Sequence, residues 1–152
     1  MDADVSTLPI AVGARATFSK TVGETDIYLF AGISGDFARN HVDEEFMTVD
    51  GRGGRIAHGA LMIAFMSTAS TRICEAVPDD SPVIPASLGY DRVRFVKPVM
   101  IGDTVTVDYR VAEVDPEAMR TRSDITVTNQ RGETVAVATH ILKFIRREKL
   151  FS

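Results

Sequence analysis

The chain has 152 residues, of which 45% are apolar and 25% are charged, and its formal net charge is −4. This length suffices for one domain with a hydrophobic core and is short for two, so we expect residues 1–152 to form a single domain. The negative charge argues against a general nucleic-acid-binding protein. The single cysteine, Cys74, cannot form a disulfide within the chain.

Signal peptides, transit peptides and membrane-spanning segments cannot be recognised in the sequence, and there is no internal repeat or low-complexity tract. We therefore expect a cytoplasmic protein that has no membrane partner. The overall composition is that of an ordinary globular domain.

The N-terminal part predicts a short strand and then a short helix. Residues 14–20 are assigned to the strand. Thr25 is a suitable N-cap for a helix over residues 26–31 that turns its apolar side chains inward. Gly32 and Gly35 allow a tight backbone turn, which should end the helix.

Polar and glycine-rich segments follow this helix. Residues 36–41 are expected to form a loop. Residues 43–47 carry acidic side chains at their start, which favours one or two helical turns. Glycine and arginine fill residues 51–55, which predicts a flexible basic loop.

Residues 56–71 form the longest stretch without Asp, Glu, Lys or Arg. Their apolar side chains recur at helical spacing over a face much wider than that of a surface helix. The stretch is too short and too rich in Ser, Thr and Gly to cross a bilayer, which needs roughly 20 apolar residues. It predicts a buried central helix whose first turn carries His58 and Gly59.

The C-terminal part alternates between strand and turn patterns after a loop at residues 78–85. Four strands are predicted, over residues 87–96, 104–114, 119–129 and 134–146. Turn residues typical of hairpins stand between them at 101–103, 115–117 and 130–132. The last strand is apolar on both faces, as expected of an interior strand.

These elements define an α+β arrangement, in which an antiparallel five-stranded sheet curves around the central helix. A single sheet leaves its outer face and one end of the helix uncovered. Association of two copies would cover them, so we expect a homodimer or a higher homo-oligomer.

The segment 31–43 resembles the signature of the MaoC-like, (R)-specific enoyl-CoA hydratases. That signature runs Ser-Gly-Asp-x-Asn-Pro-(Ile/Leu)-His, and its corresponding positions hold Ser34, Gly35, Asp36 and His41. The spacing of five residues between the Asp and the His is retained.

Two further blocks of the family follow in the same order. Residues 54–61 are similar to the block in which a His-Gly pair opens the central helix. Residues 95–99, with Gly102 and Asp103, are similar to the family's Phe-x-x-Pro-Val…Gly-Asp passage. The resemblance spans roughly residues 12–145 and implies the hotdog fold for a single MaoC-like domain.

The chain departs from the signature between Asp36 and His41, where Ala38, Arg39 and Asn40 replace Asn-Pro-(Ile/Leu). Loss of the proline leaves a looser loop with an additional N–H donor. Arg39 could pair with a carboxylate on the substrate, or it could point outward to a CoA phosphate or to water.

The resemblance implies a hydro-lyase that adds water to, or removes it from, the 2,3 double bond of an enoyl thioester. This reaction needs a base for the water at C3, an acid for C2 and hydrogen-bond donors for the thioester oxygen. By resemblance, His41 is the base and Asp36 supplies the proton to C2. The backbone N–H of Gly59, at the positive end of the central helix, is the expected oxyanion donor.

Six positions are expected to bind substrate or to shape its pocket: Ser34, Gly35, Arg39, Asn40, His58 and Ser67. For His58 the alternative is to hold the preceding loop through a hydrogen bond. For Ser67 the alternative is a bond back to its own helix. The partner is expected to be an acyl-CoA or acyl-carrier-protein thioester, which is the substrate, and no cofactor is predicted.

Other functions remain open at this point. No Cys/His motif is present and the histidines lack metal-ligand spacing, so no metal site is predicted. A hotdog thioesterase is an alternative, although its carboxylate would normally lie on the central helix, where residues 56–71 hold no Asp or Glu. The altered loop also leaves open a non-catalytic module that binds acyl thioesters.

Overall fold

The computed structural model describes residues 8–51 and 53–150, with the backbone alone at 50 and 150. In chain order the elements are β1 (Arg15–Thr21), α1 (Glu24–Ser34), α2 (Arg39–Val42), α3 (Glu44–Thr48), the 3₁₀ turn η1 (Val49–Gly51), α4 (Gly59–Cys74), β2 (Val83–Phe95), β3 (Thr104–Asp115), β4 (Arg120–Asn129), β5 (Thr134–Arg146) and the 3₁₀ turn η2 (Arg147–Leu150).

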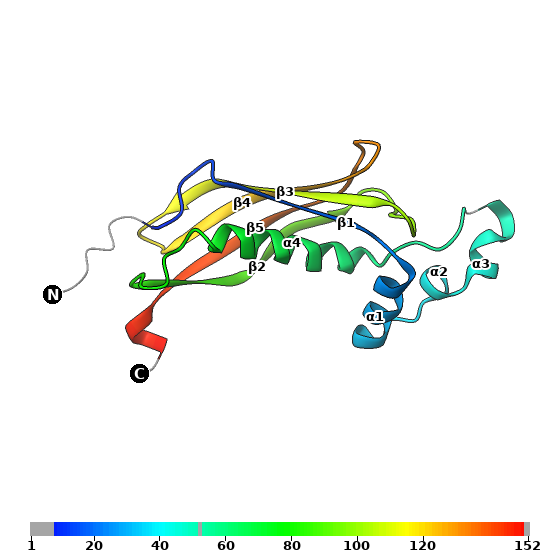
Figure 1. Cartoon of the computed structure of the whole chain (residues 1–152), viewed down its shortest axis with the longest axis horizontal. Coiled ribbons are helices and arrows are strands. Elements are labelled where there is room, and N and C mark those ends of the chain that lie inside the picture. The colour runs from blue at the N-terminus through cyan, green and yellow to red at the C-terminus, as the bar shows by residue number, and fades with distance from the viewer. Residues whose placement is uncertain (1–7, 52, 151–152) are drawn as a thin grey trace.

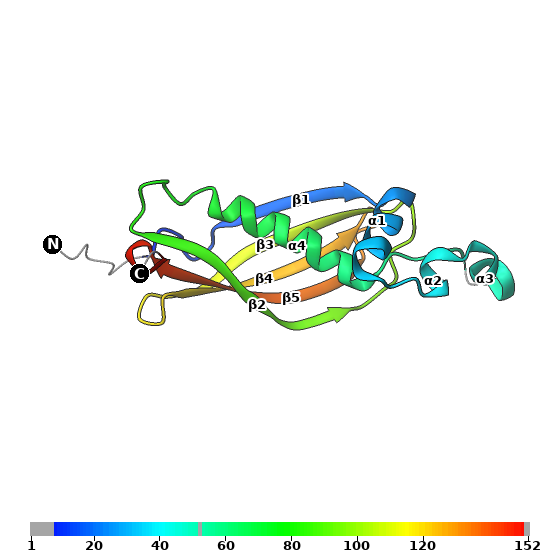
Figure 2. The same cartoon turned by 90° about the horizontal axis from the view of Figure 1, so that it is seen from below.

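One antiparallel sheet holds the five strands in the order β1-β3-β4-β5-β2. The sheet curves around α4, which runs along its concave side (Figures 1 and 2). The predicted α+β class and the five-stranded sheet around a central helix are therefore confirmed. β5 lies between β4 and β2, so it is an interior strand as predicted.

The link between β2 and β3 is not the predicted hairpin. β2 pairs with β5, whereas β3 pairs with β1 and β4, so residues 96–103 leave one sheet edge and rejoin the sheet beside the other. Gly102 does form a turn, with φ of 96°, but its N–H donates to Val22 O at 2.7 Å, just beyond β1. Turn residues mark where a chain reverses, and they do not specify which strand it then joins. The other two predicted hairpins are confirmed.

β2 begins at Val83, earlier than the predicted start at residue 87, and it includes Pro85. The predicted loop over residues 78–85 is correspondingly shorter. Proline cannot donate to a neighbouring strand, but β2 is an edge strand and has such a neighbour on one side only.

The start of α1 differs from the prediction, because Gly23 rather than Thr25 is the N-cap. The carboxylate of Asp26 accepts the Gly23 N–H at 2.8 Å. An acidic side chain within the first turn thus accepts the backbone N–H that precedes the helix. Its negative charge is also stabilised by the positive end of the helix dipole.

The end of α1 also lies later than predicted, since the helix continues through Gly32. It stops at Gly35, which has φ of 78° and donates its N–H to Ala31 O at 2.8 Å. Glycine inside a helix costs only about 1 kcal/mol, whereas a left-handed residue ends the helical hydrogen-bond pattern. The position of the left-handed glycine therefore decides where α1 ends.

The segment predicted as a loop at 36–41 contains the start of the single-turn helix α2. The helical turns predicted at residues 43–47 are confirmed as α3, with Asp43 as N-cap. The Asp43 carboxylate accepts the Phe46 N–H at 2.9 Å. That bond, followed by the one from Arg39, lowers the pKa of Asp43.

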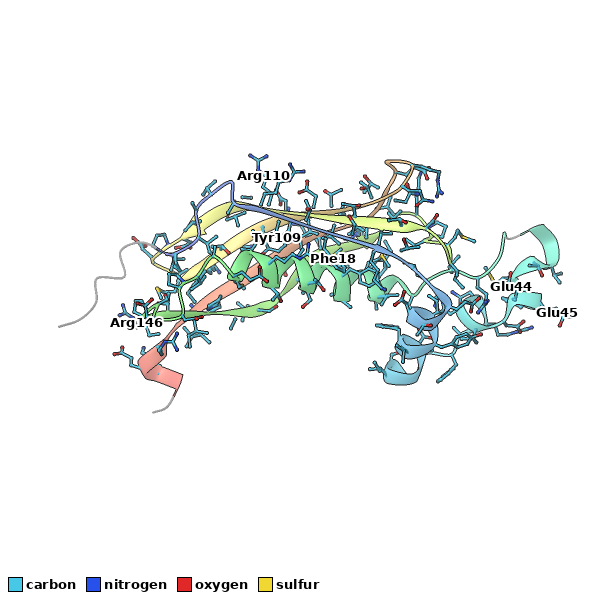
Figure 3. The ribbon with its side chains drawn as sticks, viewed as in Figure 1. Phe18, Glu44, Glu45, Tyr109, Arg110 and Arg146 are labelled. Atoms are coloured by element: carbon cyan, nitrogen blue, oxygen red, sulfur yellow. The ribbon has the colours of Figure 1, made fainter. Side chains whose placement is uncertain are left out.

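The core forms between α4 and the concave face of the sheet. The buried residues of α4 are Leu61, Met62, Phe65, Met66, Ala69, Ser70 and Ile73. Figure 3 shows the strand alternation on β3, where Tyr109 points toward α4 and Arg110 points out from the opposite face. Among the described helices, none is long and apolar enough to cross a membrane.

A polar group interrupts this core at His140 on β5, whose side chain is fully buried. Its Nδ1 lies 2.8 Å from the Tyr109 hydroxyl on β3, and its Nε2 lies 2.9 Å from the Ser87 hydroxyl on β2. The Tyr90 ring stacks on the imidazole at 4.5 Å. Burial lowers the pKa of His140 to about 4, because the cation would lose its hydration.

This burial predicts a loss of stability in mild acid. The unfolded chain protonates His140 near pH 6.5 and the folded chain only near pH 4, so the free energy of unfolding should fall as the pH decreases through that range. The full effect is roughly 3 kcal/mol. Urea unfolding at several pH values, compared with His140→Gln, measures it. If the variant and the wild type show the same pH dependence over this interval, His140 does not titrate as described.

Candidate active site

The site lies at the N-terminal end of α4, where α1, α2 and α3 extend beyond the sheet (Figures 1 and 2). Three residues from separate segments meet there. A carboxylate oxygen of Asp36, a ring nitrogen of His41 and a ring nitrogen of His58 all lie within 4.8 Å of one another. Asp36 follows α1, His41 lies on α2, and His58 is the N-cap of α4.

The tautomer of His41 follows from its contacts. Its Nδ1 lies 2.8 Å from the carbonyl oxygen of Ile56, and a carbonyl only accepts, so Nδ1 carries the proton in the neutral ring. Nε2 of the neutral ring then carries a lone pair, so it can act as a base. The same hydrogen bond fixes the ring orientation of this buried side chain.

His58 holds the loop that carries Asp36. Its Nε2–H donates to the backbone carbonyl of Asp36 at 2.9 Å, which is the loop-holding role considered for it from the sequence. Its ring stacks on that of His41 with a centroid distance of 3.7 Å. The remaining nitrogen, Nδ1, is buried without a partner among the described residues.

Asp36 is exposed, and its carboxylate accepts the N–H of Ala38 at 3.2 Å. Two other predicted residues shape its loop. The hydroxyl of Ser34 donates to Phe30 O at 2.7 Å and accepts the Asp36 N–H at 3.2 Å, while Gly35 provides the left-handed turn. Both therefore bend the backbone so that the Asp36 side chain leaves the end of α1 beside the histidines.

Arg55, predicted in a flexible basic loop, is instead only 9% exposed. Its Nε donates to Glu44 of α3 at 2.7 Å, Nη1 donates to the Tyr28 hydroxyl of α1 at 3.1 Å, and Nη2 binds Glu24 of α1. The hydrogen bonds to Glu24 and then Glu44 raise the pKa of Arg55. The guanidinium thus ties two helices to the segment that leads into α4.

The segment after Arg55 runs between the loop of Asp36 and the link that follows β2. The Ile56 N–H donates to Asn40 O at 3.1 Å, and the Ile56 carbonyl accepts from His41. The Ala57 N–H donates to Val99 O at 2.7 Å. These bonds fix the distance between His41 and the start of α4.

A cavity of about 440 Å³ opens at this position. Its lining includes Asn40, His41, His58, Gly59, Met62 and Phe95. Asp36 is not part of this lining, although its carboxylate lies near the two rings. The cavity is mostly apolar away from the histidines, as a site for an acyl group would be.

Gly59 lies in the first turn of α4, as predicted, and it lines the cavity. An aromatic side chain packs directly against it. A Cβ placed on Gly59 would lie 2.5 Å from the ring of Phe95. Glycine is therefore required here by the packing of Phe95 as well as by any approaching ligand.

Two predicted substrate-binding residues lie elsewhere. Arg39 donates from Nε to Asp43 at 2.9 Å, and its guanidinium lies 4.1 Å from the centroid of the Phe46 ring, so it points along α2 and α3 rather than into the cavity. Ser67 is exposed on α4 and contacts the Tyr90 hydroxyl. Its own carbonyl accepts from Thr71 at 3.2 Å.

The cluster of Asp36, His41 and His58 has ligand types suited to a metal, although sequence spacing gave no reason to group them. The two imidazole planes are inclined by only 26°. A metal ion lies in the plane of each ligating ring, about 2 Å from the nitrogen. Planes this close to parallel do not meet within that reach, so the stacked rings cannot bind one ion together without reorientation.

Sequence reasoning missed three residues of the site: Arg55, Ile56 and Phe95. Arg55 stands next to glycines, which is typical of an exposed loop. No sequence pattern indicates that the carbonyl of Ile56 accepts a hydrogen bond from His41. The available signal for Arg55 was its position within the second motif block, residues 54–61. Phe95 had been noted within the third block without a role.

Comparison with known proteins identifies the family of this chain. The family profile described as MaoC like domain matches residues 9–135. Together with the five-stranded sheet and central helix, this match shows that the chain belongs to the MaoC-like family and has its hotdog fold.

Two curated relatives and one solved structure illustrate the similarity. An (R)-specific enoyl-CoA hydratase of Rhodospirillum rubrum is 38% identical over 109 residues, which cover 71% of this chain and 70% of the relative. A 3-hydroxybutyryl-CoA dehydratase of Methylorubrum extorquens is 33% identical over 114 residues, covering 74% and 68%. The structure of R-hydratase PhaJ1 from Pseudomonas aeruginosa has a TM-score of 0.72 at 33% identity, covering 88% and 81%.

The contact between Gly59 and Phe95 predicts a non-additive pair of substitutions. Gly59→Ala should lower the free energy of unfolding by about 1–3 kcal/mol, because its methyl group overlaps the Phe95 ring. In a Phe95→Ala background the same change should be neutral or stabilising, since alanine favours helices over glycine by up to about 1 kcal/mol. Urea unfolding of the four proteins measures the coupling, and additive effects would show that Phe95 does not restrict position 59.

Proposed function

We propose that this protein, as a single domain and without a cofactor, adds or removes water at the 2,3 double bond of an enoyl thioester with R stereochemistry. The observation that carries the proposal is the pairing of Asp36 with a His41 whose Nε2 lone pair is directed away from its Ile56 contact. A base and an acid within reach of one water molecule are what reversible hydration requires.

In the proposed hydration His41 activates the water and Asp36 protonates the substrate. His41 removes a proton from water through Nε2, and the resulting hydroxide oxygen bonds to C3 of the substrate. The hydrogen bond from Nδ1 to Ile56 O stabilises the cation that His41 becomes. The proton then passes from His41 to the Asp36 carboxylate and from Asp36 to C2, which restores the neutral imidazole and the carboxylate.

Negative charge develops on the thioester oxygen while the bond to C3 forms. The backbone N–H of Gly59 stands in the first turn of α4, where amide donors lack helical acceptors and the helix dipole is positive. A donor held by a long, buried helix does not reorganise during the reaction, which is the condition for effective stabilisation of an oxyanion.

A thioesterase is less well supported. α4 carries no Asp or Glu between Gly59 and Cys74, so no carboxylate projects from the helix to activate water at the thioester carbon. Incubation with crotonyl-CoA and longer 2-enoyl-CoA substrates separates the possibilities. Loss of the conjugated absorbance supports the hydro-lyase, release of free thiol supports a thioesterase, and binding without either supports a non-catalytic module.

The carrier of the acyl group is CoA or an acyl carrier protein. In the basic loop predicted at residues 51–55, Arg55 is already paired in the interior, and Arg52 lies outside the described residues. Lys97 lines the cavity but is bound to Glu133 at 2.7 Å. A phosphate that met Lys97 would compete with this ion pair.

Substitution of either proposed catalytic residue should abolish hydration while the fold is retained. Asp36→Asn and His41→Ala are each expected to lower kcat by at least about 100-fold, because each removes one proton transfer. The control Asp80→Asn changes an exposed carboxylate in the loop after α4 and should retain full activity. Retention of more than about a tenth of kcat, a loss of only ~1.4 kcal/mol, by either site variant would contradict the assignment.

The proposed assembly is a homodimer formed along β2. β2 is an edge strand, and Leu88, Phe95 and Val96 expose 63%, 51% and 55% of their surface. An edge strand presents unpaired backbone groups to a second strand, and apolar side chains beside it favour burial. Pairing of two copies here would extend the sheet and cover the mouth of the cavity near Phe95.

Light scattering at micromolar concentration should give at least twice the chain mass of 16.6 kDa. Leu88→Arg should shift the protein toward the monomer, because a charge would be buried in an interface expected to exceed about 1,000 Å². Val12→Arg is the matched control, since Val12 is exposed to 62% but precedes the other edge strand. A monomeric wild type, or equal effects of both variants, would exclude assembly through β2.

A further inference from the structure

Asn40 stands where the MaoC-like signature has Ile or Leu, and Ala38 stands where the signature has Asn. The side-chain amide of the signature is therefore absent from its usual position, and a different amide directly precedes His41. Asn40 lines the cavity, and its Nδ2 lies 3.3 Å from Nε2 of His41.

The direction of this contact follows from the tautomer. Nδ1 of His41 donates to Ile56 O, so Nε2 of the neutral ring can only accept. The amide of Asn40 is the donor. It therefore meets the atom that takes the proton from water in the proposed reaction.

The backbone of Asn40 is held without help from its side chain. Its carbonyl accepts the Ile56 N–H at 3.1 Å, and the residue lies within the turn of α2. In the part of the chain that the structure describes, the bond to His41 is the hydrogen bond that the Asn40 amide makes. The side chain is thus not needed to shape the loop, and its position beside Nε2 of His41 indicates a role in the reaction.

We propose that Asn40 is a catalytic residue, which holds the nucleophilic water together with His41; this inference rests on the proposed hydration. In the substrate complex a water molecule enters between the two side chains. One O–H of the water points to Nε2 of His41, and the water oxygen accepts Nδ2–H of Asn40. The amide thereby directs the remaining oxygen lone pair toward C3.

The step balances with one water consumed. His41 takes the proton, the water oxygen forms the C–O bond at C3, and the π electrons of the double bond move toward the thioester. The proton passes from His41 to the Asp36 carboxylate and from Asp36 to C2, so that both groups return to their starting states. Asn40 gives up no atom and changes no charge.

The test compares Asn40→Leu and Asn40→Ala with the wild type on crotonyl-CoA. Leucine matches the size of asparagine and fits the signature at this position, so the fold should persist. Both variants should lose about 10- to 100-fold in kcat with KM changed less than threefold, because the contact forms with water rather than with the substrate.

Ala76→Leu is the matched control. It adds the same side chain at an exposed position beyond the C-terminal end of α4, away from the site, and leaves the Asn40 amide in place. It should keep kcat within about threefold of the wild type. Retention of wild-type kcat by both Asn40 variants would overturn the proposal, as would an equal loss in Ala76→Leu.

A spectroscopic measurement separates this inference from the proposed function. The ¹⁵N chemical shift of His41 Nε2 reports a hydrogen bond to its lone pair, whether or not the protein turns over enoyl thioesters. The shift should move toward that of an unbonded nitrogen in Asn40→Leu and stay unchanged in Ala76→Leu. An unchanged shift in Asn40→Leu would overturn the inference, whereas an inactive wild type with the expected shift change would overturn the hydratase assignment and the water-holding role, leaving only the contact.

Discussion

The buried guanidinium of Arg55 determines how the helices beyond the sheet meet α4. It binds Glu24, Tyr28 and Glu44, which belong to two different helices. A buried charge is tolerated only when it is paired. The pairing therefore holds α1 and α3 against the segment that begins α4.

The active-site geometry depends on this arrangement through the backbone. Residues 53–58 run beside the loop of Asp36 and α2, so the peptide groups of Ile56 orient His41 and Asn40. His58, at the end of the same segment, holds the backbone of Asp36. One short segment thus positions both residues, His41 through the carbonyl of Ile56 and the loop of Asp36 through the side chain of His58.

The sequence predicted most of the fold, because hydrophobic periodicity marks the central helix and the strands whatever their partners are. It placed Asp36 and His41 together through the motif spacing. It did not predict that β2 pairs with β5, since the turn at Gly102 is compatible with several topologies. The burial of Arg55 was missed because it depends on acidic partners from α1 and α3. The direction of Arg39, which the sequence left open, follows from its i,i+4 pair with Asp43.

The contact of His140 with Tyr109 and Ser87 has a consequence for strand register. β2 and β5 are separated by many residues along the chain, and a shift of one residue in a strand moves every side chain to the opposite face. Such a shift of β5 would turn His140 to the outer face and remove its contacts with the hydroxyls of Tyr109 and Ser87 from the core. The imidazole therefore favours the one register of β2, β3 and β5 in which its two hydroxyl contacts form.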